Sequence, residues 1–392
     1  MVLLIGRSRR MLTMACLFCT MSSLSWATCT SPMQVISRAP VGADVVAQIR
    51  ALSANGELGF LSAFCQTAVP SEVAFCQAER TLRLHANLVC HAEQLATGKS
   101  ASVPFAERYP FDLTSPASVI FRGSAVLLVA ASRVAVRKGK TGEALHYENL
   151  LFRLAKRAGA SPCLNACLTQ AAIEQLALEN MRFLLTVEGK NGEFVREASA
   201  CYRQGYVLPD FISALKGERR LLLREAKTTK GQFKDDATRV LARLNGALPL
   251  EAKPYWQVVN KLRALDREGI DLSAATSSQC DVLHAFYADI AKVRADVIAQ
   301  ALLTRSALEL LALRCVRGRL PGRPDSSKWP RDPYTGRALG YRKVGDGFRL
   351  SCEDTATPSW SREFFWQPDK NPLHKSQAPR GHRPGLMIAQ QA

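Results

Sequence analysis

The sequence predicts a mainly α-helical protein, with a body of helical hairpins or bundled helices and a small β-hairpin cap near the C-terminus. Apolar residues recur at three- and four-residue spacing through most of the chain, and the pattern changes to turns and strand-like alternation after Gly318. The 392 residues are 47% hydrophobic, a globular composition that excludes wholesale disorder and collagen-like repetition. No apolar run approaches the roughly 18 residues of a membrane span, which excludes a multi-span membrane protein.

Residues 1–27 have the pattern of a secretory signal peptide. A positively charged N-terminal segment is followed by the uncharged, apolar stretch 11–24 and then by a small residue at each of the positions 25 and 27, where a cleavage site requires them. The positive charge comes from Arg7, Arg9 and Arg10. We therefore expect a periplasmic or secreted protein after cleavage near Ala27. The alternatives are an inner-membrane protein anchored by an uncleaved N-terminus and a buried N-terminal helix.

Ten cysteines remain after such a cleavage, and an even number in an exported chain predicts a set of disulfides. They are Cys29, Cys65, Cys76, Cys90, Cys163, Cys167, Cys201, Cys280, Cys315 and Cys352. Sequence does not give their pairing. Cys163 and Cys167 are four residues apart, so they share a face if this stretch is helical. Since no second pair of ligands lies nearby, we expect each to bond to a neighbouring helix rather than to a metal.

The region 28–113 reads as helical. A short amphipathic helix is expected within 45–61, and a longer one from Ser71, a suitable N-cap, to Gly98. His85 and His91 flank Cys90. We expect the two imidazoles to lie at an interface between helices rather than to form a metal site with Cys90. A proline-rich stretch at 104–116 is the best candidate for a linker.

The region 114–202 predicts a helical hairpin, with helices over 117–139 and 140–159 and a third over 161–189. The short turn that contains Gly139 makes the first two helices antiparallel. Gly139, Ala144 and Leu151 then stand where a tetratricopeptide repeat has its turn glycine, small packing residue and apolar contact. The hairpin therefore resembles one such repeat. No second copy follows at a period of about 34 residues, so a tandem array is not expected.

The region 203–317 also predicts helices. Charged residues over 209–248 indicate two exposed amphipathic helices on either side of Gly231, and a short helix follows over 252–268. The longest helix is expected over 281–317, where apolar residues from Ile290 to Leu302 recur at the spacing of a core-facing helix.

The region 318–356 reads as a turn and a β-hairpin. Strands are expected over 338–344 and 348–352, joined at Gly345-Asp346-Gly347. Ten residues form the signature of this segment: Asp332, Pro333, Tyr334, Gly336, Leu339, Tyr341, Gly345, Asp346, Gly347 and Phe348. This ending resembles that of a group of exported or membrane-anchored bacterial proteins of unknown function. The resemblance implies a helical exported protein with a small β cap, and it implies no activity.

The tail over 357–392 is rich in proline, basic and aromatic residues, and its last residues are expected to be partly disordered. Four aromatic side chains are candidates for a partner contact, although docking onto the protein's own helices is the favoured alternative. They are Trp360, Phe364, Phe365 and Trp366.

The formal net charge is +18, which favours anionic partners. We find no nucleic-acid-binding module, so nucleic acid is not an expected partner. No motif for a nucleophile elbow, a zinc protease, a phosphate loop or a dinucleotide site is present, and paired carboxylates such as Glu148 and Glu174 arise by chance in helical proteins. The sequence predicts no catalytic, cofactor-binding or metal-binding residues.

We therefore expect a non-enzymatic adaptor or accessory factor for another protein of the bacterial cell envelope. The first alternative is a basic binding module for anionic envelope polymers or lipids. The second is a hydrolase whose site is assembled from distant positions.

Overall fold

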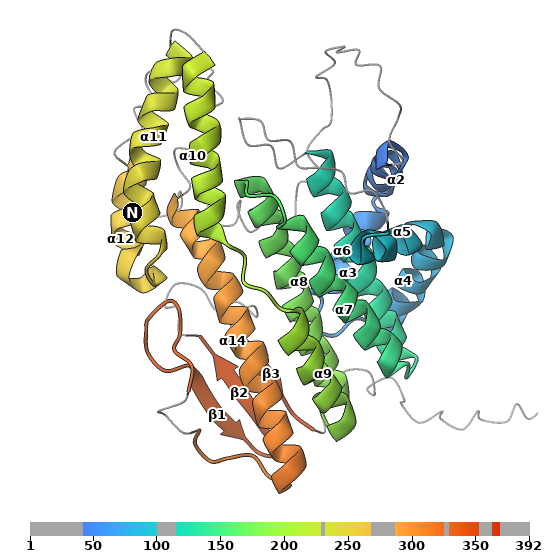
Figure 1. Cartoon of the computed structure of the whole chain (residues 1–392). Coiled ribbons are helices and arrows are strands. Elements are labelled where there is room, and N and C mark those ends of the chain that lie inside the picture. The colour runs from blue at the N-terminus through green and yellow to red at the C-terminus, as the bar shows by residue number, and fades with distance from the viewer. Residues whose placement is uncertain are drawn as a thin grey trace, which may run out of the picture.

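The computed structural model describes residues 42–99, 115–228, 232–267, 287–324, 329–352 and 363–368. Within these ranges the protein has twelve helices and one three-stranded antiparallel sheet at the C-terminal end (Figure 1). The predicted fold class is confirmed. The signal-peptide prediction for residues 1–27 and the predicted linker over 104–114 lie outside the described residues.

Four N-terminal helices pack on one long apolar helix, α6 (Pro116–Arg137). They are α2 (Gly42–Ala54), α3 (Glu57–Gln66), α4 (Glu72–Leu84) and α5 (Ala86–Thr97). The predicted caps are confirmed: the Ser71 hydroxyl accepts from the backbone N–H of Ala74 at 3.2 Å, and Gly98 ends α5 in a left-handed conformation.

The single helix expected from Ser71 to Gly98 is wrong, because the chain breaks at His85. The backbone of His85 leaves helical geometry (φ −114°, ψ 35°). Its imidazole Nε2 lies 3.0 Å from a carboxylate oxygen of Glu57 on α3. This tertiary contact holds the break, which divides the stretch into α4 and α5.

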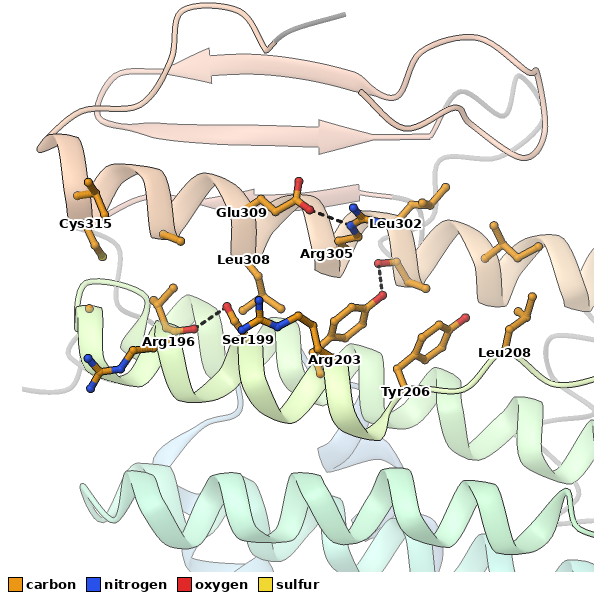
Figure 2. A pocket seen from close by; sticks show the side chains of 17 residues that line it. Arg196, Ser199, Arg203, Tyr206, Leu208, Leu302, Arg305, Leu308, Glu309 and Cys315 are labelled. Atoms are coloured by element: carbon orange, nitrogen blue, oxygen red, sulfur yellow. Dashed lines mark hydrogen bonds and ion pairs between the residues drawn. The ribbon is translucent and has the colours of Figure 1, made fainter. Parts of the chain in front are cut away.

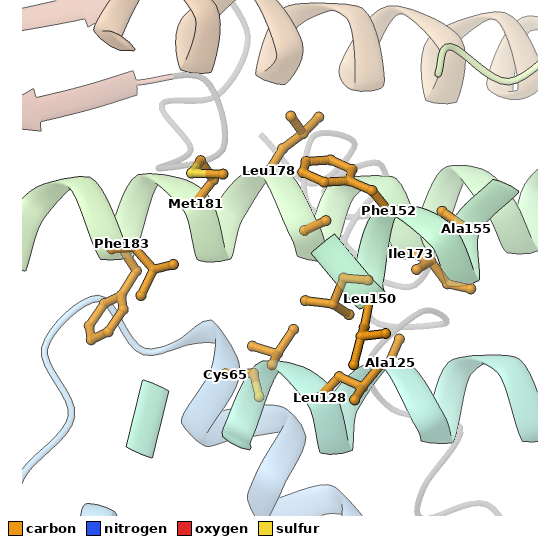
Figure 3. Close-up of a cluster of buried hydrophobic side chains, with 14 of the residues drawn as sticks. Cys65, Ala125, Leu128, Leu150, Phe152, Ala155, Ile173, Leu178, Met181 and Phe183 are labelled. Atoms are coloured by element: carbon orange, nitrogen blue, oxygen red, sulfur yellow. The ribbon is translucent and has the colours of Figure 1, made fainter. Parts of the chain in front are cut away.

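The central predictions are confirmed by α6, α7 (Thr141–Ala158) and α8 (Leu164–Glu188), which form the inner layer of the body. The turn between α6 and α7 places Gly139 at φ 73°, a conformation that favours glycine. Side chains from α3, α6, α7 and α8 meet in the first hydrophobic core (Figure 3). Only α6 among the described helices is long and apolar enough to cross a membrane, and most of it is buried in this core. The described part of the chain is therefore not a multi-span membrane protein.

The second half adds α9 (Gly192–Gly205), α10 (Phe211–Thr228), α11 (Gln232–Glu251), α12 (Tyr255–Arg267) and the 31-residue α14 (Tyr287–Arg317). Helices α10, α11 and α12 pack around a second hydrophobic core. Helices α8 and α14 contribute to both cores, so they connect the two halves of the molecule. The predicted helices are confirmed over α10, α11, α12 and α14, and the predicted start of the last helix at 281–286 lies outside the described residues. Helix α9 was not predicted as a helix.

The C-terminal cap is the sheet β1 (Gly340–Val344), β2 (Gly347–Ser351) and β3 (Glu363–Trp366). The β1–β2 hairpin is confirmed, with Val344 opposite Gly347 and Gly345 in the left-handed region at the turn. Of the signature residues, Asp332 organises the preceding turn: its carboxylate accepts from the backbone N–H of Tyr334 and from the Thr335 hydroxyl.

The third strand was not predicted, and it packs against α8 and α14, which agrees with the favoured expectation that the tail aromatics dock onto the protein's own helices. Phe364 and Trp366 point inward from β3 and are buried in the first core, where each lies beside Phe348. Because strand side chains alternate between faces, Phe365 between them is exposed. Phe364 and Trp366 are therefore core residues and not surface residues for a partner. Trp360 and residues 369–392 lie outside the described residues.

The predicted disulfides are not found in the described part of the chain, where no disulfide joins any two of the eight described cysteines. These are Cys65, Cys76, Cys90, Cys163, Cys167, Cys201, Cys315 and Cys352. Cys163 and Cys167 both lie at the start of α8, but Cys163 packs in the first core and Cys167 in the second. Cys29 and Cys280 lie outside the described residues.

Candidate docking groove between helices α9 and α14

An open groove of about 1110 Å³ runs between α9 and α14 (Figure 2). The two helices are antiparallel: Gly192 at the start of α9 lies beside Cys315 at the end of α14, and the Tyr202 hydroxyl donates to the carbonyl of Ala301 at 3.1 Å. On α14 the lining extends from Ile298 to Val316. At 1.5 Å per residue this is roughly 27 Å, the length of a helix of about 18 residues.

Local sequence explains how α9 forms one wall. The side chain of Asn191 accepts from the backbone N–H groups of Glu193 and Phe194, which caps the helix. The buried residues Phe194, Val195, Ala198 and Tyr202 recur at helical spacing and fix one face of α9 on the body. That face leaves another edge, with Arg196, Ser199 and Arg203, along the groove (Figure 2).

Two stacked tyrosines form an aromatic part of the lining. The rings of Tyr202 and Tyr206 are 5.4 Å apart and nearly parallel, and Phe152 meets Tyr202 edge-on at 6.5 Å. Burial raises the pKa of both phenols well above the ordinary value, with smaller contributions from neighbouring charges that include Glu174. Both therefore stay protonated at neutral pH, and Tyr206, which is only partly buried, adds an uncharged aromatic surface to the lining.

The charges of the groove favour an acidic occupant. Its lining contains three arginines, Arg196, Arg203 and Arg305, and one acid, Glu309. Arg305 is paired with Glu309 at 2.8 Å, and this hydrogen bond raises the pKa of Arg305. Arg196 lies 3.4 Å from Glu193, and Arg203 has no ion-pair partner within the described ranges. The net charge of the lining is thus positive.

A buried polar network lies behind the groove, in the interior of the body. Asn180 on α8 donates to the Glu148 carboxyl at 2.7 Å and to the Ser132 hydroxyl at 2.9 Å. Burial raises the pKa of Glu148 to about 8 and that of Glu174 well above its ordinary value, where the charge on Glu148 adds to the rise. Both carboxyls are fully buried, so neither can reach a substrate as a general acid or base would.

The same network includes the buried guanidinium of Arg133. It donates to the carbonyls of Phe64 at 3.0 Å and of Thr67 at 2.7 Å, where α3 ends. These bonds add a side-chain donor at the end of the helix, where the Phe64 carbonyl also accepts from the backbone N–H of Thr67 at 3.3 Å. The guanidinium also lies over the Phe183 ring at 4.2 Å. The network therefore serves packing between α3, α6, α7 and α8.

The groove brings together few of the residues that sequence analysis singled out. Cys315 lines one end, whereas the signature residues from Asp332 to Phe348 build the β cap. Within the described ranges no group of three or more His, Cys, Asp or Glu side chains is placed to hold a metal ion. Sequence analysis missed Arg196, Ser199, Arg203 and Tyr206, although the N-cap at Asn191 and the apolar spacing after it indicate a helix there.

Comparisons with known proteins give no relative: no family model, no curated protein and no solved structure matches the chain.

Proposed function

We propose that this protein is a non-enzymatic helical adaptor that binds an amphipathic, acidic helix of a partner protein in the groove between α9 and α14. The observation that supports this proposal best is an apolar channel of helical length whose lining has a net positive charge. Two neighbouring helices present ridges and grooves into which a third helix packs. Acidic residues on the flanks of that helix would then meet Arg196, Arg203 and Arg305.

Exposed apolar side chains at both ends of the groove support an occupant. Leu208 is 39% exposed at one end, and Val316 is 85% exposed at the other. An apolar patch with a polar rim is a common property of protein-binding surfaces. The partner is proposed to be a cell-envelope protein. This location is supported by the signal-like pattern of residues 1–27 alone, because no disulfide among the described cysteines adds to it.

Site-specific photo-crosslinking in intact cells tests the proposal. A photoreactive residue replaces Leu302, which lines the groove, and in a control it replaces Val73, which is exposed on α4. We expect one partner to be captured from position 302 and not from position 73. Mass spectrometry of the crosslinked peptide should show acidic residues that flank an apolar stripe at helical spacing.

A blocking variant completes the test. Ser199→Arg inserts a long side chain into the groove, and Ser62→Arg makes the same change at a partly buried helical serine on α3. The crosslink should disappear with Ser199→Arg and persist with Ser62→Arg. Equal capture from positions 302 and 73, or capture that survives Ser199→Arg, contradicts the proposal. A crosslinked species composed of two copies of this chain would replace the proposed partner with self-association.

A further inference from the structure

A second, smaller hollow lies beyond the end of α14 and has a volume of about 380 Å³. Six residues line it: Arg317, Arg319, Leu320, Pro321, Gly322 and Lys343. Three of the six are cations and none is acidic. They come from the last turn of α14, from the segment that follows it and from strand β1, so the fold brings these charges together from separate elements.

The segment that forms the hollow is held in place on both sides. Gly318 turns the chain out of α14 at φ 68°, and its N–H donates to the carbonyl of Arg314 at 2.8 Å. Leu320 is buried in the first core. The Tyr341 hydroxyl on β1 donates to the carbonyl of Pro321 at 2.6 Å. The backbone that carries the three cations is therefore held by the fold, so ordering this segment adds little to the entropic cost of binding.

Within the described residues, no acidic side chain pairs with the cations of the hollow. Among the residues that the structure describes, no carboxylate lies within ion-pair distance of Arg317, Arg319 or Lys343. A cation in the last turn of a helix interacts favourably with the helix dipole, which accounts for Arg317. That explanation does not extend to Arg319 and Lys343, which lie outside the helix. Like charges that face one shared hollow repel each other, and an anion between them removes this repulsion.

We propose that this basic hollow binds a phosphoryl group, as a phosphate monoester or diester. Two guanidinium groups can each offer paired donors to phosphate oxygens, and the Lys343 ammonium adds a third positive charge. A phosphate monoester has a charge of about −1.5 to −2 at pH 7, which matches three cations better than a single carboxylate does. The hollow is larger than a bare phosphate needs, so it leaves room for the alcohol to which the phosphate is esterified.

Binding measurements on the full chain test this proposal with two probes. Calorimetric titration with inorganic phosphate measures binding of the free anion. Co-sedimentation with vesicles of phosphatidylglycerol in phosphatidylcholine measures binding of a lipid headgroup. The variant Arg317→Gln/Arg319→Gln/Lys343→Gln removes the three charges. Its control removes three exposed cations elsewhere and gives the same net charge: Arg80→Gln/Lys99→Gln/Arg220→Gln.

We expect each single substitution in the hollow to weaken phosphate binding by about fivefold, and the triple variant to abolish it. The control variant should bind like the unmodified protein. If the vesicles also bind and lose binding only in the hollow variant, the phosphoryl group belongs to a lipid. If phosphate binds and the vesicles do not, it belongs to a soluble compound.

Two results overturn the proposal. One is that the unmodified protein shows no binding of inorganic phosphate at a phosphate concentration of about 10 mM, which is roughly the weakest affinity of interest. The other is equal loss of binding in the hollow and control variants, which would mean that only net charge matters. The hollow does not depend on the groove between α9 and α14, because Ser199→Arg blocks the groove and leaves all three cations in place. Failure of the proposed adaptor function would therefore leave this test unchanged.

Discussion

Replacement of Trp366 by alanine tests whether the C-terminal strand is part of the body or a free tail. Trp366 is 1% exposed in the first core. Its ring stacks on Phe348 at 5.8 Å, and the guanidinium of Arg314 lies 4.9 Å from its centroid. The indole lies so close to Gly189, after α8, that a Cβ at that position would collide with it. The side chain thus joins β3 to β2, to α14 and to the end of α8.

The size of the effect follows from these contacts. Truncation of a buried tryptophan or phenylalanine to alanine costs about 3–5 kcal/mol, because both the transfer of apolar surface and the remaining cavity contribute. A cation over an aromatic face adds about 0.5–1 kcal/mol where the cation is partly exposed. Since β3 is an edge strand that can relax toward the cavity, we expect Trp366→Ala to destabilise the protein by about 3 kcal/mol.

Urea unfolding, followed by far-UV circular dichroism, measures this loss. With an m-value of about 3 kcal/mol per molar, the midpoint should fall by about 1 M. Phe365→Ala is the matched control, because Phe365 is the neighbouring aromatic residue on the same strand and is 42% exposed. It should change stability by less than about 0.5 kcal/mol. Equal effects of the two variants, or an unchanged midpoint for Trp366→Ala, would refute the placement of β3 against the body.

Three further predictions concern the interior, one turn and the thiols. Glu148 holds its proton in the folded protein up to a pH of about 8, whereas its unfolded pKa is close to 4.5, so stability should fall as pH rises between these values. The urea midpoint should therefore fall less between pH 5 and pH 8 in Glu148→Gln than in the unmodified protein. An equal fall in the two proteins would count against a protonated Glu148. Gly139 and Gly142 both have open space around them, so an added methyl group meets no neighbour at either site. Gly139→Ala should lower the stability of the protein by about 1 kcal/mol because of the positive φ, while Gly142→Ala in the first turn of α7 should raise it by about 0.5 kcal/mol. Shifts of the thermal unfolding midpoint in the same direction for the two variants would contradict this. Among the eight described cysteines, a thiol reagent followed by peptide mass mapping should label the three exposed ones in the native protein and the four buried ones only after unfolding. Release of new thiols on reduction would show that disulfides form. The three exposed thiols are Cys76, Cys90 and Cys315.

The helical body was predictable because its signals are local. The apolar periodicity of α6, α7, α8 and α14, together with the turn at Gly139, depends on residues within a few turns of each other. The break at His85 could not be predicted in this way, because its contact with Glu57 joins residues 28 positions apart. The third strand was missed because its four residues are too few to show an alternating pattern, and because its inward residues pair with Phe348 and with α14.

The groove could be predicted less well than the helices that form it. Its walls meet through contacts such as that of Tyr202 with Ala301, which are 99 residues apart in the chain. Sequence shows that α14 is long and apolar, but it does not show that α9 covers only part of it. The excess of positive charge was visible in the composition, whereas its concentration at Arg317, Arg319 and Lys343 depends on β1 folding back beside the end of α14.

Helix α14 explains why both proposed surfaces are rigid. Its inward residues belong to the first core over 299–311 and to the second core over 287–297, so the helix is held along most of its length. The groove includes Ala301 and Leu308 of the first core and extends along the same helix to Val316, and the basic hollow begins at the next residue, Arg317. A shift of α14 toward either ligand would disturb both cores, and close-packed interiors resist such movement. An acidic helix in the groove and a phosphoryl group in the hollow would therefore bind to preformed surfaces, so occupation of one should change the affinity of the other only through their charges.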